Sequence, residues 1–168
     1  MTRGERHKVE RKGTVRAVCI SPAKGTEKKP VEKGVFIPGF GIENDAHAGS
    51  WHRQVSLLSF ESVEEFNRRG AGVTDGAFGE NLLVEGIDLK TLPVGSVLKA
   101  GTVVLRTTQI GKNCHSSCAI RQRTGDCIMP REGIFAEVLE GGDTGDAALR
   151  QPDGHNGAQT SKRSSIRF

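Results

Sequence analysis

The sequence predicts a mainly β protein with a few helices, an α+β fold built as a barrel of mostly antiparallel or mixed strands. Short runs rich in β-branched residues are separated by single glycines, and only one segment has a clear helical pattern. The strand–helix alternation of a doubly wound parallel sheet is missing. The 168 residues fit one domain. We expect that domain over residues 13–149, after a basic extension (1–12) and before a disordered tail (150–168).

The first third of the chain predicts two strands that lead into loops. Residues 13–21 place Val15, Ala17 and Cys19 on one side and Arg16, Val18 and Ile20 on the other. They are rich in β-branched residues and are followed by Pro22, which favours a strand. Residues 22–34 are rich in Lys, Glu and Gly, and predict a mobile loop or hairpin tip. Residues 35–45 are interrupted by Pro38 and two glycines, which favours a short strand followed by a loop.

The clearest helix is expected directly after a buried strand at residues 54–58. Ser59 is a good N-cap, and acidic residues early with basic residues late suit the helix dipole. Gly70 supplies the stop. The apolar stripe of this helix consists of Phe60, Val63 and Phe66.

The second half of the chain predicts further strands with glycine turns between them. They are expected at residues 81–84, 96–99 and 102–110. Residues 133–139 fit either a short helix or a strand, and their length and flanking glycines favour the strand.

The net charge of +4 does not indicate a nucleic-acid-binding face. Residues 1–12 and residues 150–168 each carry +3, which leaves residues 13–149 at −2. The stacking aromatics of a nucleic-acid platform are also missing. No apolar run reaches the roughly 20 residues of a membrane span, and no secretory signal is recognisable. We therefore expect a cytoplasmic protein that binds neither nucleic acid nor membrane.

Two cysteines in Gly111-Lys-Asn-Cys-His-Ser-Ser-Cys118 are the strongest candidates for chemistry. They follow the end of an expected strand, and Lys112 and His115 could lower a thiol pKa from about 8.5. The alternative is that Cys118 is a small buried hydrophobe. Cys127 resembles core and Cys19 resembles strand packing. A zinc site formed by Cys114, His115, Cys118 and Cys127 lacks the usual paired spacing and is a weaker hypothesis, as is reversible pairing of Cys114 with Cys118.

Two further segments gather polar side chains. The loop 44–54 holds Asp45, His47, His52 and Arg53, which either contact a ligand or tie the loop down by hydrogen bonds. The segment 126–132 offers Arg131, which is either an anion clamp or part of a surface turn. Phosphate cradles of the Walker or Rossmann kind and a serine nucleophile elbow are absent.

Three motifs in order resemble the stand-alone MOSC domain family, which is named after the C-terminal domain of molybdenum cofactor sulfurase. They are GIENDAHAGSWHRQVSLL, TDGAFGENLLVEGIDL with PVGSVLKAG, and TQIGKNCHSSCAI followed by GDCIMPREGIFAEVLEGG. The resemblance runs from about residue 13 to residue 142. It implies a β-rich barrel that acts on molybdenum-pterin or other metal–sulfur chemistry through a cysteine.

The resemblance also implies roles for individual residues. Cys118 best matches the recurrent cysteine that carries sulfur or ligates molybdenum, and Cys114 is second. The pocket residues that would hold the molybdenum cofactor (molybdopterin) are His47, Arg53, Lys112, His115 and Arg131.

The function implied is cofactor binding and sulfur carriage. Sulfur would arrive from a separate pyridoxal-phosphate cysteine desulfurase and pass to a molybdenum-cofactor or metal–sulfur acceptor protein. An enzyme, if this is one, would be sulfurtransferase-like or a molybdenum-dependent reductase component. The alternative from another class is a thiol-redox or zinc-binding module that uses Cys114, His115 and Cys118.

The sequence departs from the family pattern at two places, and we expect each departure to affect the structure. Asn44 stands where glycine usually precedes the aspartate, which we expect to restrict the loop backbone. Residues 143–149 are a poor version of the family's last strand, so we expect the barrel to be incompletely closed.

Overall fold

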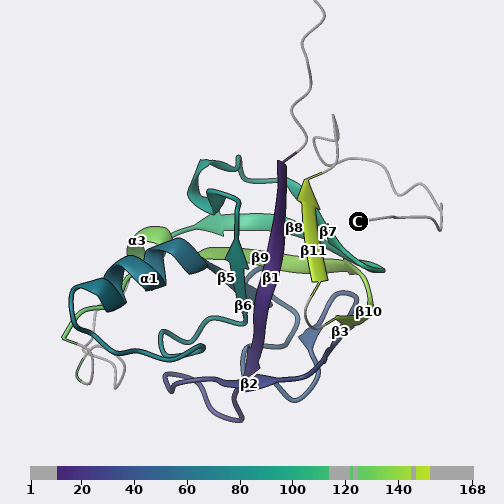
Figure 1. The fold of residues 1–168 in the computed structure, drawn as a ribbon. Coiled ribbons are helices and arrows are strands. Elements are labelled where there is room, and N and C mark those ends of the chain that lie inside the picture. Colours follow the sequence, from purple (N-terminus) through teal and green to yellow (C-terminus); the bar gives the residue numbers. More distant parts are fainter. Residues whose placement is uncertain (1–10, 114–121, 123–124, 145–146, 152–168) are drawn as a thin grey trace, which may run out of the picture.

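The computed structural model describes residues 11–113, 122, 125–144 and 147–151. These residues form strands with few helices, which confirms the predicted fold class (Figure 1). The strands are β1 (Arg11–Ile20), β2 (Lys29–Val31), β3 (Gly34–Ile37), β4 (Gly41–Ile42), β5 (Val55–Ser59), β6 (Leu82–Glu85), β7 (Val97–Ala100), β8 (Val103–Ile110), β9 (Ile134–Glu140), β10 (Gly142–Thr144) and β11 (Ala147–Gln151). The helices are α1 (Phe60–Arg68), the 3-10 turn η1 (Leu89–Thr91) and α3 (Met129–Glu132).

The main sheet is strongly curled and mixed. Its strand order is β11-β7-β8-β9-β5-β6-β1-β2, and β11 also pairs with β1, so the two ends of the curl meet. Among the described pairs of this sheet, β5 and β6 run parallel and the others run antiparallel. The parallel pair is connected through α1, because parallel strands need a crossover segment. A small second sheet has the order β10-β3-β4.

The chain packs two apolar clusters on opposite sides of this sheet. The inner cluster gathers alternate residues of most strands, such as Val15, Leu57 and Leu105. The outer cluster joins α1 and α3 to the sheet through Val63, Phe66, Phe78, Leu83, Met129 and Phe135. Because side chains alternate across a strand, neighbouring residues such as Leu57 and Leu58 belong to different clusters.

Helix α1 begins and ends where the sequence predicts. Ser59 is its N-cap residue, but the Ser59 hydroxyl donates to the Glu61 carboxylate at 2.9 Å and makes no capping bond to the backbone. Gly70 follows the C-cap residue with a φ of 93°, the left-handed conformation that glycine adopts freely. Val63 and Phe66 supply the buried face.

One expectation about the irregular segments was confirmed and one was wrong. The segment 22–34 was expected to be a mobile loop or a hairpin tip, and it forms a hairpin in which β2 pairs antiparallel with β1 and Lys28 is fully buried. The last strand was expected to be poor, but β11 pairs with five residues of β1, from Arg11 to Val15. Backbone hydrogen bonds define this pairing, so β11 forms despite its few apolar residues. It runs to Gln151, two residues beyond the boundary expected from the sequence.

Candidate functional site

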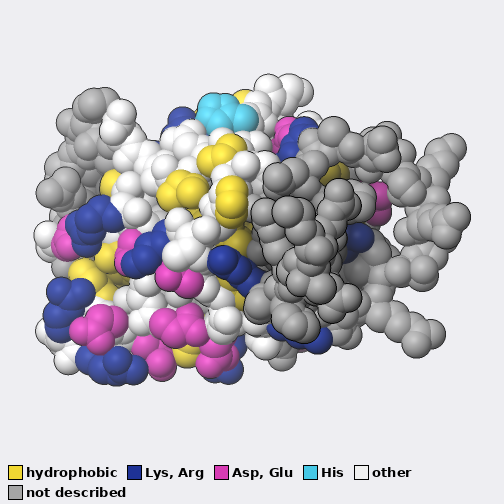
Figure 2. All heavy atoms as spheres, turned by 90° about the horizontal axis from the view of Figure 1, so that it is seen from above, with side chains coloured by type: hydrophobic (Ala, Val, Ile, Leu, Met, Phe, Trp, Pro, Cys, Tyr) yellow, Lys and Arg dark blue, Asp and Glu magenta, His cyan; other side chains and the backbone are white. Residues whose placement is uncertain are grey.

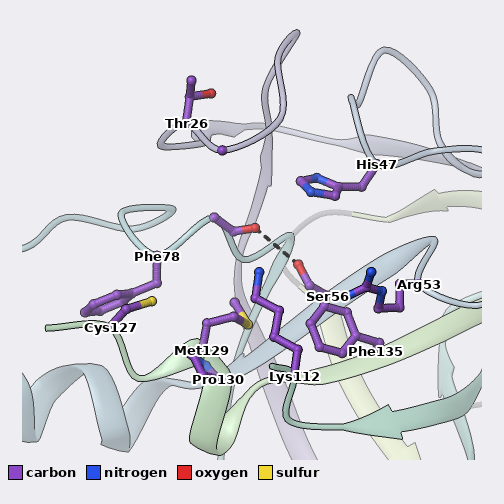
Figure 3. A pocket seen from close by; sticks show the side chains of 12 residues that line it. Thr26, His47, Arg53, Ser56, Phe78, Lys112, Cys127, Met129, Pro130 and Phe135 are labelled. Atoms are coloured by element: carbon purple, nitrogen blue, oxygen red, sulfur yellow. Dashed lines mark hydrogen bonds between the residues drawn. The ribbon is translucent and has the colours of Figure 1, made fainter. Parts of the chain in front are cut away.

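A small cavity of about 80 Å³ opens between the loop before β2, the loop 44–54 and the segment around α3 (Figure 3). Figure 3 shows the side chains of His47, Arg53 and Lys112 pointing toward this space. All three were predicted from the sequence as cofactor-binding residues. The remaining lining residues are Gly25, Thr26, Ser56, Phe78, Gly79, Cys127, Met129, Pro130 and Phe135.

The loop 44–54 is held in place by Asp45, which is buried. Its carboxylate accepts hydrogen bonds from the backbone N–H groups of Ser21, at 3.1 Å, and His47, at 3.2 Å. Asn44, just before it, has a φ of 66°. This is the left-handed region where glycine is favoured and asparagine is tolerated, so Asn44 adopts a backbone conformation that suits a glycine at this position. Asp45 therefore ties the loop down by hydrogen bonds, as one interpretation predicted, while His47 and Arg53 line the cavity and ligand contact stays a prediction.

A buried lysine from the segment 22–34, which was predicted to be a mobile loop or a hairpin tip, contacts this loop. The Lys28 ammonium contacts the Asp45 carboxylate at 2.6 Å, His47 Nδ1 at 2.9 Å and the Ser21 hydroxyl at 3.3 Å. Neither Lys28 nor Asp45 exposes any of its side chain. A lysine among charged residues in a glycine-containing segment is normally solvated, so nothing in the local sequence indicates this burial.

The surroundings of His47 keep its imidazole neutral. Burial lowers the pKa of His47 to about 4, and the positive charges of Lys28, Lys112 and Lys24 add to this effect, while Asp45 opposes it. Burial also lowers the pKa of Lys28, opposed by its hydrogen bond and charge interaction with Asp45. At neutral pH, His47 therefore enters the pocket as an uncharged ring.

Arg53 is held between aromatic rings. Its guanidinium carbon lies 4.7 Å from the Trp51 ring centre and 5.6 Å from the Phe135 ring centre. Trp51 in turn donates from its indole N–H to the His47 carbonyl at 2.7 Å. Among the described residues, Arg53 Nε is buried without a hydrogen-bond partner. A buried donor without a partner is costly, so this atom is suited to a ligand acceptor.

Lys112 is positioned by a close contact between the end of β8 and α3. Gly111 has a φ of 68°, and a Cβ there would lie 2.6 Å from the Pro130 carbonyl oxygen. The N–H groups of Gly111 and Lys112 donate to the carbonyls of Gly133, at 2.7 Å, and Pro130, at 3.1 Å. These bonds fix the backbone from which the predicted cysteine segment continues.

The four cysteines and His115 differ in what the structure describes of them. Cys114, His115 and Cys118 lie outside the described residues. Cys19 is buried and its pKa is raised to about 12, mainly by burial, which agrees with a packing role. Cys127 was predicted to be core, and it does pack against the outer cluster, but it also lines the cavity. In the part of the chain that the structure describes, no group of His, Cys, Asp and Glu has the arrangement of a metal site.

Two other predicted polar residues lie elsewhere. Arg131 does not line the cavity, and its guanidinium pairs with Asp126 at 3.0 Å on an exposed face of α3. His52 is exposed and contacts Gln109 at 2.9 Å. Figure 2 shows basic and acidic side chains interspersed on the visible face, with no continuous basic surface among the residues described there.

The arrangement can bind a small anionic group. Arg53 and Lys112 supply positive charge, His47 supplies a neutral polar ring, and Phe78, Met129 and Phe135 supply apolar surface that limits the access of water. The cavity is small compared with the roughly 300–1,000 Å³ of common ligand sites. It therefore suits one end of a ligand rather than a whole cofactor.

The curled sheet and its cavity define a β-barrel-like domain with a small pocket lined by basic side chains, and comparison with known proteins identifies the family. The family model described as MOSC domain matches residues 44–146, so the chain belongs to the MOSC domain family. The match includes the loop of His47 and Arg53, the strand end at Lys112 and the cysteine segment.

Solved structures share the fold. The crystal structure of the YuaD protein from Bacillus subtilis superposes with a TM-score of 0.67 at 20% identity, covering 86% of this chain and 99% of that chain. YiiM from Geobacillus stearothermophilus gives 0.61 at 19% identity, covering 84% and 75%. YiiM from Escherichia coli gives 0.59 at 17% identity, covering 91% and 72%.

The comparison with curated proteins gave no match. Within the described ranges, neither α1 nor the shorter helices have the length and apolar character needed to cross a bilayer.

Proposed function

We propose that this MOSC domain binds the molybdenum cofactor through its anionic group and carries sulfur on a cysteine of the segment 114–118. The observation that supports this proposal most is the basic cavity formed by Arg53 and Lys112, with Arg53 Nε buried and unpartnered among the described residues. Lys112 lines that cavity, and Cys114 follows it by two residues in the sequence. An anion held there would therefore lie near the start of the thiol-bearing segment.

The residues present fit the anionic part of molybdopterin. A phosphate carries negative charge and several acceptor oxygens, which match the guanidinium of Arg53 and the ammonium of Lys112. The cavity of about 80 Å³ accommodates such a group, and the pterin would extend from it. Bound molybdenum would supply the centre to which sulfur is delivered. This chain's own residues bind the anion, orient it and exclude water.

The sulfur-carrier step is a thiol–persulfide exchange. The Cys118 thiol first loses its proton, and its thiolate attacks the terminal sulfur of a persulfide on a pyridoxal-phosphate cysteine desulfurase. The new S–S bond forms as the desulfurase S–S bond breaks, and the desulfurase cysteine leaves as a thiolate. The exchange needs no oxidant or reductant. The cationic side chain of Lys112 near this segment favours the attacking thiolate.

The persulfide is tested by incubating the purified protein with a cysteine desulfurase and cysteine, followed by mass spectrometry of alkylated peptides. We expect one added sulfur on Cys118, lost in Cys118→Ser and retained in Cys19→Ser, whose side chain is buried. Labelling on Cys114 would reassign the carrier within the segment. Labelling on Cys127, or equal labelling of all variants, would overturn the carrier assignment.

The cofactor part is tested separately by anaerobic purification from a molybdenum-replete host. We expect molybdenum by elemental analysis and a fluorescent oxidised pterin, both reduced in an Arg53→Met variant. Lys33→Met is the matched control, because Lys33 is exposed and does not line the cavity. Protein that contains zinc instead of molybdenum would favour the metal-binding module.

A further inference from the structure

The Lys28 ammonium has three N–H donors and no acceptor, and three neighbouring atoms are placed to receive them. These atoms are the Asp45 carboxylate at 2.6 Å, His47 Nδ1 at 2.9 Å and the Ser21 hydroxyl at 3.3 Å. The Ser21 hydroxyl itself donates to the Ala23 carbonyl at 3.0 Å, so its oxygen is free to accept from Lys28. The ion pair with fully buried Asp45 keeps the ammonium charged.

This contact determines which nitrogen of His47 carries the proton. A charged ammonium can only donate, so His47 Nδ1 must accept, and the proton of a neutral imidazole must then be on Nε2. The ring points into the cavity in Figure 3. Because Nδ1 is engaged by Lys28, Nε2–H is the ring group left to meet a ligand. No described residue accepts from it.

We infer that Lys28 is a positioning residue of this pocket, which fixes His47 as a neutral Nε2–H donor and so completes a three-donor site for an oxyanion with Arg53 and Lys112. The inference rests on the proposed anion-binding function of the cavity. It adds a residue that does not line the cavity and a defined chemical role for His47. Without Lys28, the ring could place its proton on either nitrogen and present an acceptor lone pair to the ligand.

The backbone of Lys28 also holds one wall of the cavity. The Lys28 N–H donates to the Gly76 carbonyl at 2.9 Å, and a Cβ at Gly76 would lie 2.2 Å from the Lys28 carbonyl oxygen. Gly25 and Thr26, just before Lys28, line the cavity. The buried side chain thus anchors the loop whose residues Gly25 and Thr26 line the cavity.

The hydroxyl of Ser56 does not compete for this role. It lies within hydrogen-bond distance of the Gly79 carbonyl, at 3.2 Å, and of the Asn81 side-chain carbonyl, also at 3.2 Å, and it accepts from the Asn81 N–H at 3.0 Å. The nitrogen donors among the lining side chains that remain for a ligand are the guanidinium, the ammonium and the imidazole N–H. This set selects an oxyanion such as a phosphate or molybdate, and rejects cations.

The first experiment reads the tautomer directly in the wild-type protein by ¹⁵N-correlated NMR of the histidine rings at pH 7. We expect His47 with a protonated Nε2 and an unprotonated Nδ1, assigned by its loss in His47→Gln. A protonated Nδ1 or a charged ring would overturn the inference. Because this measurement uses the unaltered protein, it does not depend on whether a Lys28 variant folds.

The second experiment measures binding of inorganic phosphate, molybdate and the phosphorylated, air-oxidised pterin derived from molybdopterin. We expect His47→Leu to weaken oxyanion binding about tenfold, the loss of one hydrogen bond to a charged group. His47→Gln keeps an N–H donor and should recover most of this loss. Lys28→Met should weaken binding and give a mixture of His47 tautomers, whereas Lys33→Met should change neither.

The outcomes separate this inference from the proposed function. Binding of the pterin phosphate but not of the free anions identifies the cofactor as the source of the oxyanion, and binding of molybdate or phosphate alone identifies a free oxyanion. Equal binding by wild-type, His47→Leu and Lys28→Met protein would overturn the role of Lys28, even if Cys118 still formed a persulfide. Oxyanion binding without any persulfide would support the inference and contradict the sulfur-carrier proposal.

Discussion

Lys28 and Asp45 form a fully buried ion pair with an N–O distance of 2.6 Å, and this pair joins two loops that are 17 residues apart in the sequence. One loop leads into β2 and the other follows β4. The Asp45 carboxylate also holds the backbone of Ser21 at the end of β1. The pair is therefore a junction of three segments beside the cavity.

Removing one partner of this pair should destabilise the fold more than removing both charges. We expect Lys28→Met to cost about 3–5 kcal/mol of unfolding free energy, because Asp45 is left as an unpaired buried charge. The double variant Lys28→Met with Asp45→Asn should recover part of this loss, since the amide oxygen of the substituted side chain can still accept from the backbone. Urea unfolding of the single and double variants measures the loss of unfolding free energy and its partial recovery. A double variant as unstable as the sum of the single changes would contradict the pairing.

The stability of the protein should fall in acid because His47 must accept a proton. Its pKa is lowered to about 4 in the folded protein, so between about pH 4 and pH 6.5 the unfolded chain binds more protons than the folded chain. The contribution of neutral His47 to the free energy of unfolding is therefore fully present above about pH 6.5, and it is lost as the pH falls toward 4.

Thermal unfolding measured from pH 4 to pH 8 checks this sign. The His47→Gln variant should show a flatter stability profile between pH 4 and pH 6.5 than the wild-type protein. The matched control is His52→Gln, because His52 is exposed and does not line the cavity. Parallel profiles for wild-type and His47→Gln protein would show that His47 is not the group that titrates.

Replacing Gly111 should disturb the pocket by displacing the backbone that positions Lys112. In Gly111→Ala, the new Cβ would lie 2.6 Å from the Pro130 carbonyl oxygen at a φ of 68°, which combines a steric clash with backbone strain. We expect a loss of about 1–3 kcal/mol in unfolding free energy and weaker phosphate binding, because Lys112 shifts with the backbone. Gly101→Ala is the control for strain alone, since Gly101 has a φ of 62° and no atom within 4 Å of its Cβ position. Equal effects of the two substitutions would argue against the clash.

Removing β11 should open the curled sheet. A chain that ends at Thr144 loses the pairing of β11 with both β1 and β7 and exposes two strand edges, so we expect a large drop in melting temperature and a tendency to aggregate. A chain that ends at Gln151 keeps every described pair and should melt close to the full chain. Circular dichroism and light scattering distinguish the two. Equal melting temperatures for all three chains would show that β11 does not contribute to closure.

The sequence predicted those parts of the fold that depend on local patterns. Short apolar runs bounded by turn residues predicted β1, β5, β6, β7 and β8 within a few residues, and length and flanking glycines favoured β9 as a strand. The stripe of Phe60, Val63 and Phe66 predicted α1. Motif resemblance placed His47 and Arg53 in one pocket with Arg131. His47 and Arg53 do line one cavity, together with Lys112, whereas Arg131 does not. These features follow from neighbouring residues or short motifs, which a single sequence displays directly.

Tertiary structure decided the features that depend on contacts between distant segments. Lys28 and Glu32 are both charged residues in the same polar stretch, yet Lys28 is buried because Asp45, His47 and Ser21 come to its ammonium from other loops. Cys127 lines the cavity while Arg131, four residues later, points away to Asp126, because α3 turns between them. The closing strand β11 depends on backbone hydrogen bonds to β1, which require no apolar side chains and so leave no pattern in the sequence.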